Sequence, residues 1–372
     1  NNIGKMSSNL VESFSTELLT IYEIRSQSDI NILRKFEDNG TPLSEPWWDI
    51  EYRREYDMTN DSEKFKDTDQ LKITGATIDE RGVLTADDKR YLSLIEGRMI
   101  GHHSPSMSGW IEGRGRTAKW RRFSIEETVF EPQFMIEESL HKKLYPSDDL
   151  KLAFIDVTSA INTRTCIAAP MPPLPCGGSA PRYTTGRGII ETFFLSGWLN
   201  SIPVDMIFRL YVNGLHLKPY HIKSMRATTN KEIIIAISEL VMSIYTHPMS
   251  IAPWYVVHSE LEGGKLPLFF NDEPNRRRIL AMIDALVSYS MGLNIEDVMW
   301  VVRQCGHENP RAHDLDQRGF WRVDGNLPVQ NRQTTIYVLA FNSLIELVRD
   351  NGHNVGISKF LSMNNGLGWL PP

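Results

Sequence analysis

The pattern of apolar and polar positions changes character near residue 230. Before this point, short apolar runs alternate with Gly, Ser and Pro residues, most clearly over residues 91–138, which predicts strands joined by long loops. Residues 152–157 and 166–169 are predicted strands. The segment 170–188 holds five prolines and several glycines, and we expect it to be a loop.

Helical spacing of apolar residues predicts most of the remaining elements. Polar N-cap residues mark the start of four of these helices: Ser26 with Asp29, Thr229 with Glu232, Asp272 with Pro274 in the first turn, and Asn294. The long apolar segment 189–211 is expected to form a helix that is interrupted near Pro203. A last helix is predicted over residues 335–348, ended by Asn351-Gly352.

These elements predict an α+β protein with two domains. The chain has 372 residues, and at about 150 residues per domain this length favours two. We place the boundary near residue 230. Residues 1–230 are expected to form a mixed α/β domain, and residues 231–372 a mainly helical subdomain that braces it.

Composition narrows the class of protein further. No run of about 18 uninterrupted apolar residues is present, so no membrane span is expected. Three cysteines are too few for a disulfide framework, which favours a reducing compartment and a cytoplasmic location. The chain starts at Asn1, without an initiator methionine or a secretory signal, and we expect it to be a piece of a longer protein.

Charge is distributed unevenly along the chain. The net charge is −6, yet residues 98–122 carry six basic side chains and a single acidic one, Glu112, for a net charge of +5. Residues 37–80 carry thirteen acidic residues against five basic ones. A basic face on an acidic body lets a protein bind a polyanion in one orientation. We therefore expect a nucleic acid, and no membrane, as the partner.

The segment 98–122 supplies most of the candidate DNA-binding side chains. Its cations can pair with phosphates or reach base edges, and its two tryptophans offer faces for stacking. The candidates are Arg98, Trp110, Arg114, Arg116, Lys119, Trp120, Arg121 and Arg122. The alternative is a solvated basic loop whose tryptophans turn into the core.

Histidines raise the question of a metal site. His102 and His103 are adjacent in a predicted loop, where contact with nucleic acid is expected and surface exposure or metal ligation are the alternatives. Cys305 with His307 and His313 forms a partial zinc pattern that lacks a second cysteine pair. We expect no metal on this chain.

Two further segments contribute candidate DNA-binding residues. Thr163, Arg164 and Thr165 follow a strand and a turn, and an arginine beside two hydroxyls can hold a phosphate. The alternative is an arginine that ties two loops together through backbone carbonyls. Asn213 and His216 follow a long apolar helix, where they either point into a groove or form part of the helix C-cap.

Catalytic motifs are absent from the sequence. It contains no glycine-rich dinucleotide or S-adenosylmethionine loop, no P-loop, no Gly-x-Ser-x-Gly elbow, no His-Glu-x-x-His motif and no Asx-Pro-Pro-aromatic motif. Glu260-Leu-Glu262 with Lys265 resembles a nuclease Glu-x-Lys motif only loosely, because the spacing is wrong. We expect no catalytic residue on this chain.

Ordered short motifs give the sequence a family resemblance. They include Phe154-Ile-Asp-Val157 with Arg164-Thr165 close behind, Gly319-Phe-Trp-Arg322 and the closing Gly368-Trp-Leu-Pro371. The other segments are 25–34, 54–62, 96–100, 199–201, 213–217, 283–287, 291–293 and 332–335. In this order and spacing the chain resembles the C-terminal target-recognition region of type IIG-like restriction–modification proteins, which are adenine-specific DNA methyltransferases. The sequence departs from that family at Ile155, where the family commonly has Arg, and at Gly101–Ser104.

The resemblance implies a DNA sequence-recognition module of a larger bacterial enzyme, of the kind that also occurs in phage-defence systems. Residues 1–230 would form its target-recognition domain, with double-stranded DNA and the upstream methyltransferase domain of the same polypeptide as partners. S-adenosylmethionine would bind in that catalytic domain, and no cofactor is expected on this chain. The alternatives are a protein-interaction scaffold, in which the basic segment binds the acidic residues 37–80 of another copy or another subunit, and an enzyme in its own right, either a nuclease or a methyltransferase.

Overall fold

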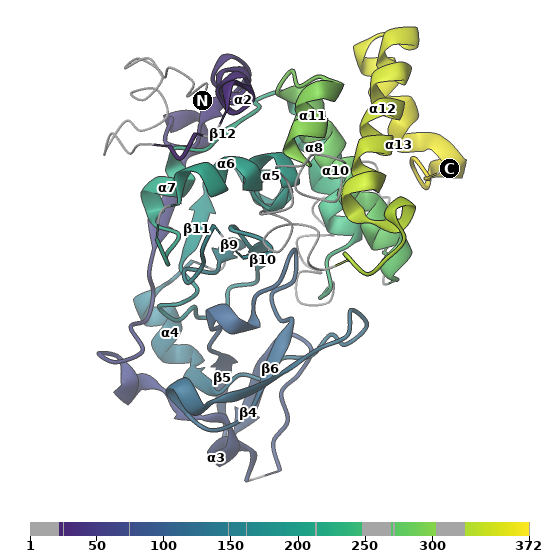
Figure 1. Ribbon diagram of the computed structural model, residues 1–372. Coiled ribbons are helices and arrows are strands. Elements are labelled where there is room, and N and C mark those ends of the chain that lie inside the picture. Colours follow the sequence, from purple (N-terminus) through teal and green to yellow (C-terminus); the bar gives the residue numbers. More distant parts are fainter. Residues whose placement is uncertain are drawn as a thin grey trace.

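Antiparallel strands occupy the N-terminal half of the chain, and the C-terminal region is mainly helical (Figure 1). The computed structural model describes residues 22–24, 26–73, 75–147, 149–160, 162–212, 214–247, 269–270, 272–302 and 324–371. The α+β class predicted from the sequence is confirmed.

The strands of this described part form four antiparallel sheets. One four-stranded sheet has the order β10 (Ala168–Met171), β9 (Lys151–Phe154), β11 (Arg182–Thr185) and β2 (Ile50–Arg53). The other has the order β3 (Lys66–Asp67), β8 (Phe134–Glu137), β5 (Lys89–Ser93) and β4 (Val83–Ala86). The two-stranded sheets pair β1 (Thr41–Pro42) with β12 (Arg226–Ala227), and β6 (Ser108–Glu112) with β7 (Lys119–Arg122).

The α-helices gather mostly after the strands in sequence. Those before residue 230 are α2 (Gln27–Asn39), α3 (Thr68–Lys72), α4 (Glu138–Leu144), α5 (Ile189–Asn200), α6 (Ile202–Tyr211) and α7 (Pro219–Lys223). Those of the C-terminal region are α8 (Lys231–Ser243), α10 (Glu273–Ser290), α11 (Ile295–Val301), α12 (Gln333–Asn351) and α13 (His353–Gly366).

Local capping signals in the sequence are largely confirmed. The Ser26 side chain caps α2, Asp272 caps α10 and Asn294 caps α11, each accepting a backbone N–H of the first turn. The prediction for α8 is wrong by one residue, because Asn230 and not Thr229 is the N-cap. The predicted interruption near Pro203 is confirmed at Ser201, which separates α5 from α6.

The prediction of a loop over residues 170–188 is wrong. Strand β11 lies within this segment and pairs with both β9 and β2, so it is a central strand of its sheet. Pro170 is tolerated in β10 because that strand is at the sheet edge. Helix α13 was also missed: the chain continues as a helix directly after the Asn351-Gly352 stop.

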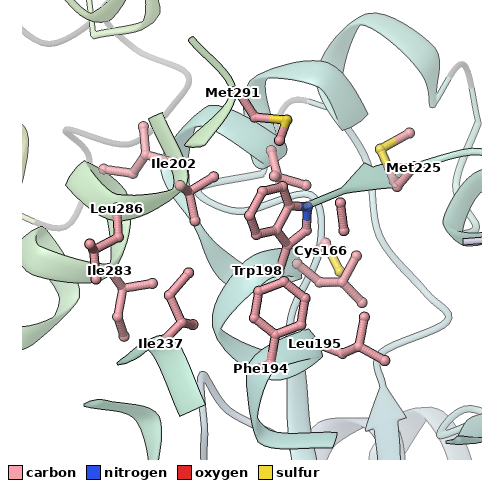
Figure 2. Packing of buried hydrophobic residues seen from close by; sticks show 14 of the residues in the cluster. Cys166, Phe194, Leu195, Trp198, Ile202, Met225, Ile237, Ile283, Leu286 and Met291 are labelled. Carbon is pink, nitrogen blue, oxygen red and sulfur yellow. The ribbon is translucent and has the colours of Figure 1, made fainter. Parts of the chain in front are cut away.

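One hydrophobic core joins the helices from both sides of residue 230. Figure 2 shows Trp198 and Phe194 of α5 packed among Ile237 of α8 and Ile283 of α10. Helices α5 and α8 approach closely because Gly197 leaves no side chain between them; a Cβ there would lie 2.4 Å from Cγ2 of Ile237. The helical region is therefore packed firmly against the elements that precede it.

A buried ion-pair cluster holds the sheet that contains β11. The Glu55 carboxylate is fully buried and accepts hydrogen bonds from Nζ of Lys151 at 2.7 Å and Nε of Arg182 at 2.8 Å. Its other oxygen accepts the backbone N–H of Cys176 at 2.9 Å. Burial raises the pKa of Glu55, but the two cations and the hydrogen bonds outweigh burial and hold the pKa below its ordinary value.

We predict that Glu55→Gln lowers the free energy of unfolding by about 3 kcal/mol, because it leaves Lys151 and Arg182 buried without a counter-charge. Chemical denaturation followed by circular dichroism measures this loss. Glu51→Gln is the matched control, since it breaks an exposed pair with Arg53 and should change stability by less than about 0.5 kcal/mol.

The same ion-pair cluster predicts a pH dependence with a definite sign. The folded-state pKa of Glu55 lies below the unfolded-state value, so its contribution is fully present above about pH 4.5 and is lost as the pH falls through the folded-state pKa. The stability difference between wild type and Glu55→Gln should therefore shrink in acid. A stability difference that does not change in acid would contradict this pH dependence. Equal stability of Glu55→Gln and Glu51→Gln at neutral pH would contradict the predicted loss of stability itself.

Candidate nucleic-acid interface

The C-terminal part of the basic segment, residues 108–122, is a β-hairpin. Strands β6 and β7 pair antiparallel, with Trp110 opposite Trp120 and a register shift between Trp110 and Glu112. The hairpin turns at Gly113, whose φ is +83°; a Cβ there would meet the Thr117 carbonyl oxygen at 2.6 Å. The glycines of this segment therefore serve the turn.

Half of the cations in the segment are engaged in ion pairs within the chain. Arg114 contacts Asp67 at 2.8 Å and Lys119 contacts Glu112 at 2.6 Å. Arg121 makes a bidentate pair with Glu131, at 2.7 and 3.0 Å, and a further pair with Glu127. The first two pairs are exposed and cost little to exchange for a phosphate. The bidentate pair instead anchors the hairpin to the segment that follows it.

The other three cations of the segment are arginines that pair with no carboxylate in the described part of the chain. Arg98, Arg116 and Arg122 are exposed and form no ion pair with any residue that the structure describes. The Arg98 guanidinium lies over the Trp120 ring, 5.9 Å from its centroid. These three arginines are the available phosphate ligands of the segment.

Helix α6 fixes the loop that carries Thr163, Arg164 and Thr165. The buried Asp205 carboxylate accepts the backbone N–H of Thr165 at 2.7 Å and of Cys166 at 3.0 Å. Arg209, one turn later, pairs with Asp205 at 2.8 Å. Its Nη atoms donate to the carbonyls of Ala160, Asn162 and Thr163. Arg209 thus ties this loop together through its backbone carbonyls.

These elements enclose one large cavity of about 1020 Å³. Its walls come from the hairpin and the residues before it, from the loop 155–167, and from the first turns of α10 with Asp324 and Gln333. Eight of the residues proposed from the sequence line it: Arg98, His102, Trp120, Arg121, Arg122, Thr163, Arg164 and Thr165. The helical region adds Arg276 and Arg277, so the cavity is strongly cationic.

The remaining candidates lie elsewhere. His103 is 1% exposed and its Nδ1 is 2.9 Å from Oγ of Ser196, so the prediction that it contacts nucleic acid or solvent is wrong. Trp110 donates its indole N–H to the Gly113 carbonyl within the hairpin. His216 is exposed and its Nδ1 lies 3.2 Å from the Asp156 carboxylate; it forms a β-bridge with Val157 of the cavity wall but does not itself line the cavity.

Some predictions fall on residues that the structure does not describe. Asn213 is one of them, as are Cys305, His307 and His313 of the partial zinc pattern. Among the residues that it does describe, no group of three or more His, Cys, Asp or Glu side chains could hold a metal ion. In the same part of the chain, no helix is both long enough and apolar enough to cross a membrane.

Sequence reasoning missed Asp205, Arg209 and the arginines of α10. The run Arg276-Arg277-Arg278 near the start of a helix was an available signal, because cations there oppose the helix dipole. Arg278 is explained by structure, since it donates to the carbonyls of Leu367 and Trp369 and holds the C-terminal segment. Arg277 pairs with Glu273 at 2.9 Å. Arg276 donates to the carbonyls of Ile244 and His102 but forms no ion pair with a carboxylate of the described residues.

The comparisons with known proteins add no relative. Neither a scan against protein-family models nor a search of the curated proteins found a match to this chain.

We predict that Arg209→Met lowers the free energy of unfolding by about 3 kcal/mol, because Asp205 is left buried without its counter-charge and three carbonyls lose their donor. Hydrogen exchange of the amides in 160–166 should accelerate in parallel. Arg349→Met, which breaks an exposed pair with Asp350, is the control and should change stability by less than about 0.5 kcal/mol. If the two variants are equally stable, Asp205 and Arg209 do not hold the loop.

Proposed function

We propose that this chain binds duplex DNA as the target-recognition module of a larger adenine-specific DNA methyltransferase of a restriction–modification or phage-defence system. The observation that carries the proposal is the cationic cavity, in which the hairpin, the 155–167 loop and α10 converge. Arginine fits this role because its planar guanidinium matches two phosphate oxygens at once. The family resemblance supplies the class of enzyme.

The size of the cavity limits what part of the DNA enters it. A volume of about 1020 Å³ lies at the upper end of the range of roughly 300–1000 Å³ for small-ligand sites. The cavity therefore suits a stretch of sugar–phosphate backbone or a single nucleotide, with the rest of the duplex lying across the surrounding hairpin. Phosphate contacts of this kind set the position and register of the protein, and base contacts from neighbouring loops set specificity.

In the parent enzyme, the upstream methyltransferase domain would bind S-adenosylmethionine and perform the chemistry. The part played by this chain is to hold the duplex while the target adenine is extruded from the stack. Arg98, Arg116 and Arg122 are its first DNA ligands, since their guanidinium groups are exposed and have no ion-pair partner in the described part of the chain.

One ion pair in the structure bears on the scaffold hypothesis. Arg114 of the basic hairpin pairs with Asp67 of the acidic region, which is the contact that the hypothesis assigns to two different copies or subunits. Here both partners belong to one chain. Size-exclusion mass measurements with and without duplex DNA separate the two functions, because a salt-sensitive oligomer that ignores DNA would favour the scaffold.

We predict that Arg98→Ala with Arg122→Ala weakens duplex DNA binding and lowers the magnitude of the salt slope by about two units, since each lost phosphate contact contributes about 0.9. Fluorescence anisotropy at several salt concentrations measures both quantities.

The control for this experiment also removes two cations. Arg34→Ala with Lys72→Ala changes two exposed cations on α2 and α3 that lie outside the cavity lining. This pair of substitutions should leave the salt slope within about half a unit. If both double variants bind DNA like the wild type, the cavity is not the DNA interface.

A further inference from the structure

Arg276 is a buried cation that forms no ion pair with any carboxylate in the described part of the chain. Its side chain is 7% exposed, and burial lowers its pKa to about 10, although the charge of Glu273 acts in the other direction. The guanidinium donates to the carbonyls of Ile244 and His102, which uses two of its five N–H donors. No carboxylate of the described residues lies within ion-pair distance. A buried charge in this state is costly unless an anion compensates it.

Two more arginines of the cavity lining, Arg164 and Arg122, act together with Arg276 on the His102 imidazole. Burial lowers the pKa of His102 well below its ordinary value, and the charges of Arg164, Arg276 and Arg122 lower it further. These arginines belong to three separate elements: the 155–167 loop, α10 and β7. Because the charges of all three arginines act on the His102 imidazole, the electrostatic potential at this point of the cavity is positive.

Polar atoms without partners lie around this point. Nε2 of His102, Nε1 of Trp120 and Oγ1 of Thr165 are all buried, and none forms a hydrogen bond to a residue that the structure describes. All three side chains line the cavity. Leaving a buried donor or acceptor unsatisfied costs about 1–3 kcal/mol, so three such atoms around one cavity indicate a polar ligand.

The two acidic residues of the cavity lining lie nearer to Arg277 than to Arg276. Glu273 pairs with Arg277, and Oδ2 of Asp324 accepts the backbone N–H of Gln333 at 2.7 Å and lies 4.0 Å from Arg277, while Oδ1 of Asp324 is buried without a hydrogen bond to any described residue. Glu273 acts on the charge of Arg276 without forming an ion pair with it.

We propose that the cavity contains a phosphate-binding centre in which Arg276 and Arg122 bind the phosphate oxygens, while Trp120 and Thr165 donate further hydrogen bonds. Guanidinium groups and neutral donors form the strongest available set for a phosphate. This inference rests on the proposed function for the source of the phosphate, which is then one group of the DNA backbone. The phosphate of a free nucleotide has the same chemistry.

The test begins with inorganic phosphate as the probe. Calorimetry and thermal unfolding are measured with phosphate, acetate or chloride at one ionic strength. Phosphate should bind saturably and raise Tm, and Arg276→Met and Arg122→Met should each weaken phosphate binding roughly tenfold, the effect of losing one charge-assisted hydrogen bond. The control Arg34→Met removes an exposed arginine of α2, outside the cavity lining, and should bind phosphate like the wild type.

Two results would contradict the proposed phosphate-binding centre. One is that acetate binds with the same affinity as phosphate, and the other is that Arg122→Met binds phosphate like the wild type. Arg122 makes no ion pair within the described chain, so its variant stays informative even where Arg276→Met fails to fold. NMR of the His102 ring gives a second readout. A bound phosphate adds negative charge beside the three arginines and should raise the pKa of His102.

Competition with duplex DNA identifies the source of the phosphate. If phosphate displaces DNA, the centre takes a backbone phosphate. If phosphate binds without displacing DNA, the phosphate-binding centre is supported and its ligand is a free phosphorylated compound. If phosphate binds but the protein does not bind DNA at all, the centre is again supported with a free phosphorylated compound as its ligand, and the proposed function fails. DNA binding without any response to phosphate would refute the centre and leave the proposed function intact.

Discussion

The Asp205 carboxylate is the interaction on which the site depends most. It is fully buried on α6, yet its oxygens accept two backbone N–H groups of the loop that precedes β10 and the guanidinium of Arg209. A buried carboxylate with this many donors is satisfied, whereas the loss of Arg209 would leave its charge uncompensated. The position of Arg164 and Thr165 in the cavity wall is therefore inherited from a helix about forty residues later in the chain.

Helix α5 reinforces the same junction. Asn200, at its last turn, accepts the backbone N–H of Ala168 and donates to the carbonyl of Ala168 and of Ser196. One side chain thereby replaces the ladder partner that edge strand β10 lacks at this residue. Asp205 and Asn200 together attach the sheet to the helical layer, which in turn places α10 opposite the hairpin.

The sequence predicted what depends on local chemistry and failed where distant contacts decide. N-caps at Ser26, Asp272 and Asn294 follow from a side chain and the next few residues, and they were found. Strand β11 was missed because prolines and glycines around it indicate a loop, while its pairing with β2 comes from residues more than a hundred positions away.

The candidate site shows the same division. A net charge of +5 over residues 98–122 could be counted, but Asp67, Glu127 and Glu131 neutralise part of it through folding. His103 was expected to contact nucleic acid or solvent and is buried.

The walls of the cavity come from both sides of residue 230, and this has a thermodynamic consequence. A ligand that touches the hairpin, the 155–167 loop and α10 at once binds only when all three are in place. Its binding free energy then adds to the stability of their junction, by mass action, in proportion to the logarithm of its concentration. Ligand binding and the stability of this junction are therefore coupled. A substitution that weakens the contacts between the helices and the sheet would lower the affinity for the ligand.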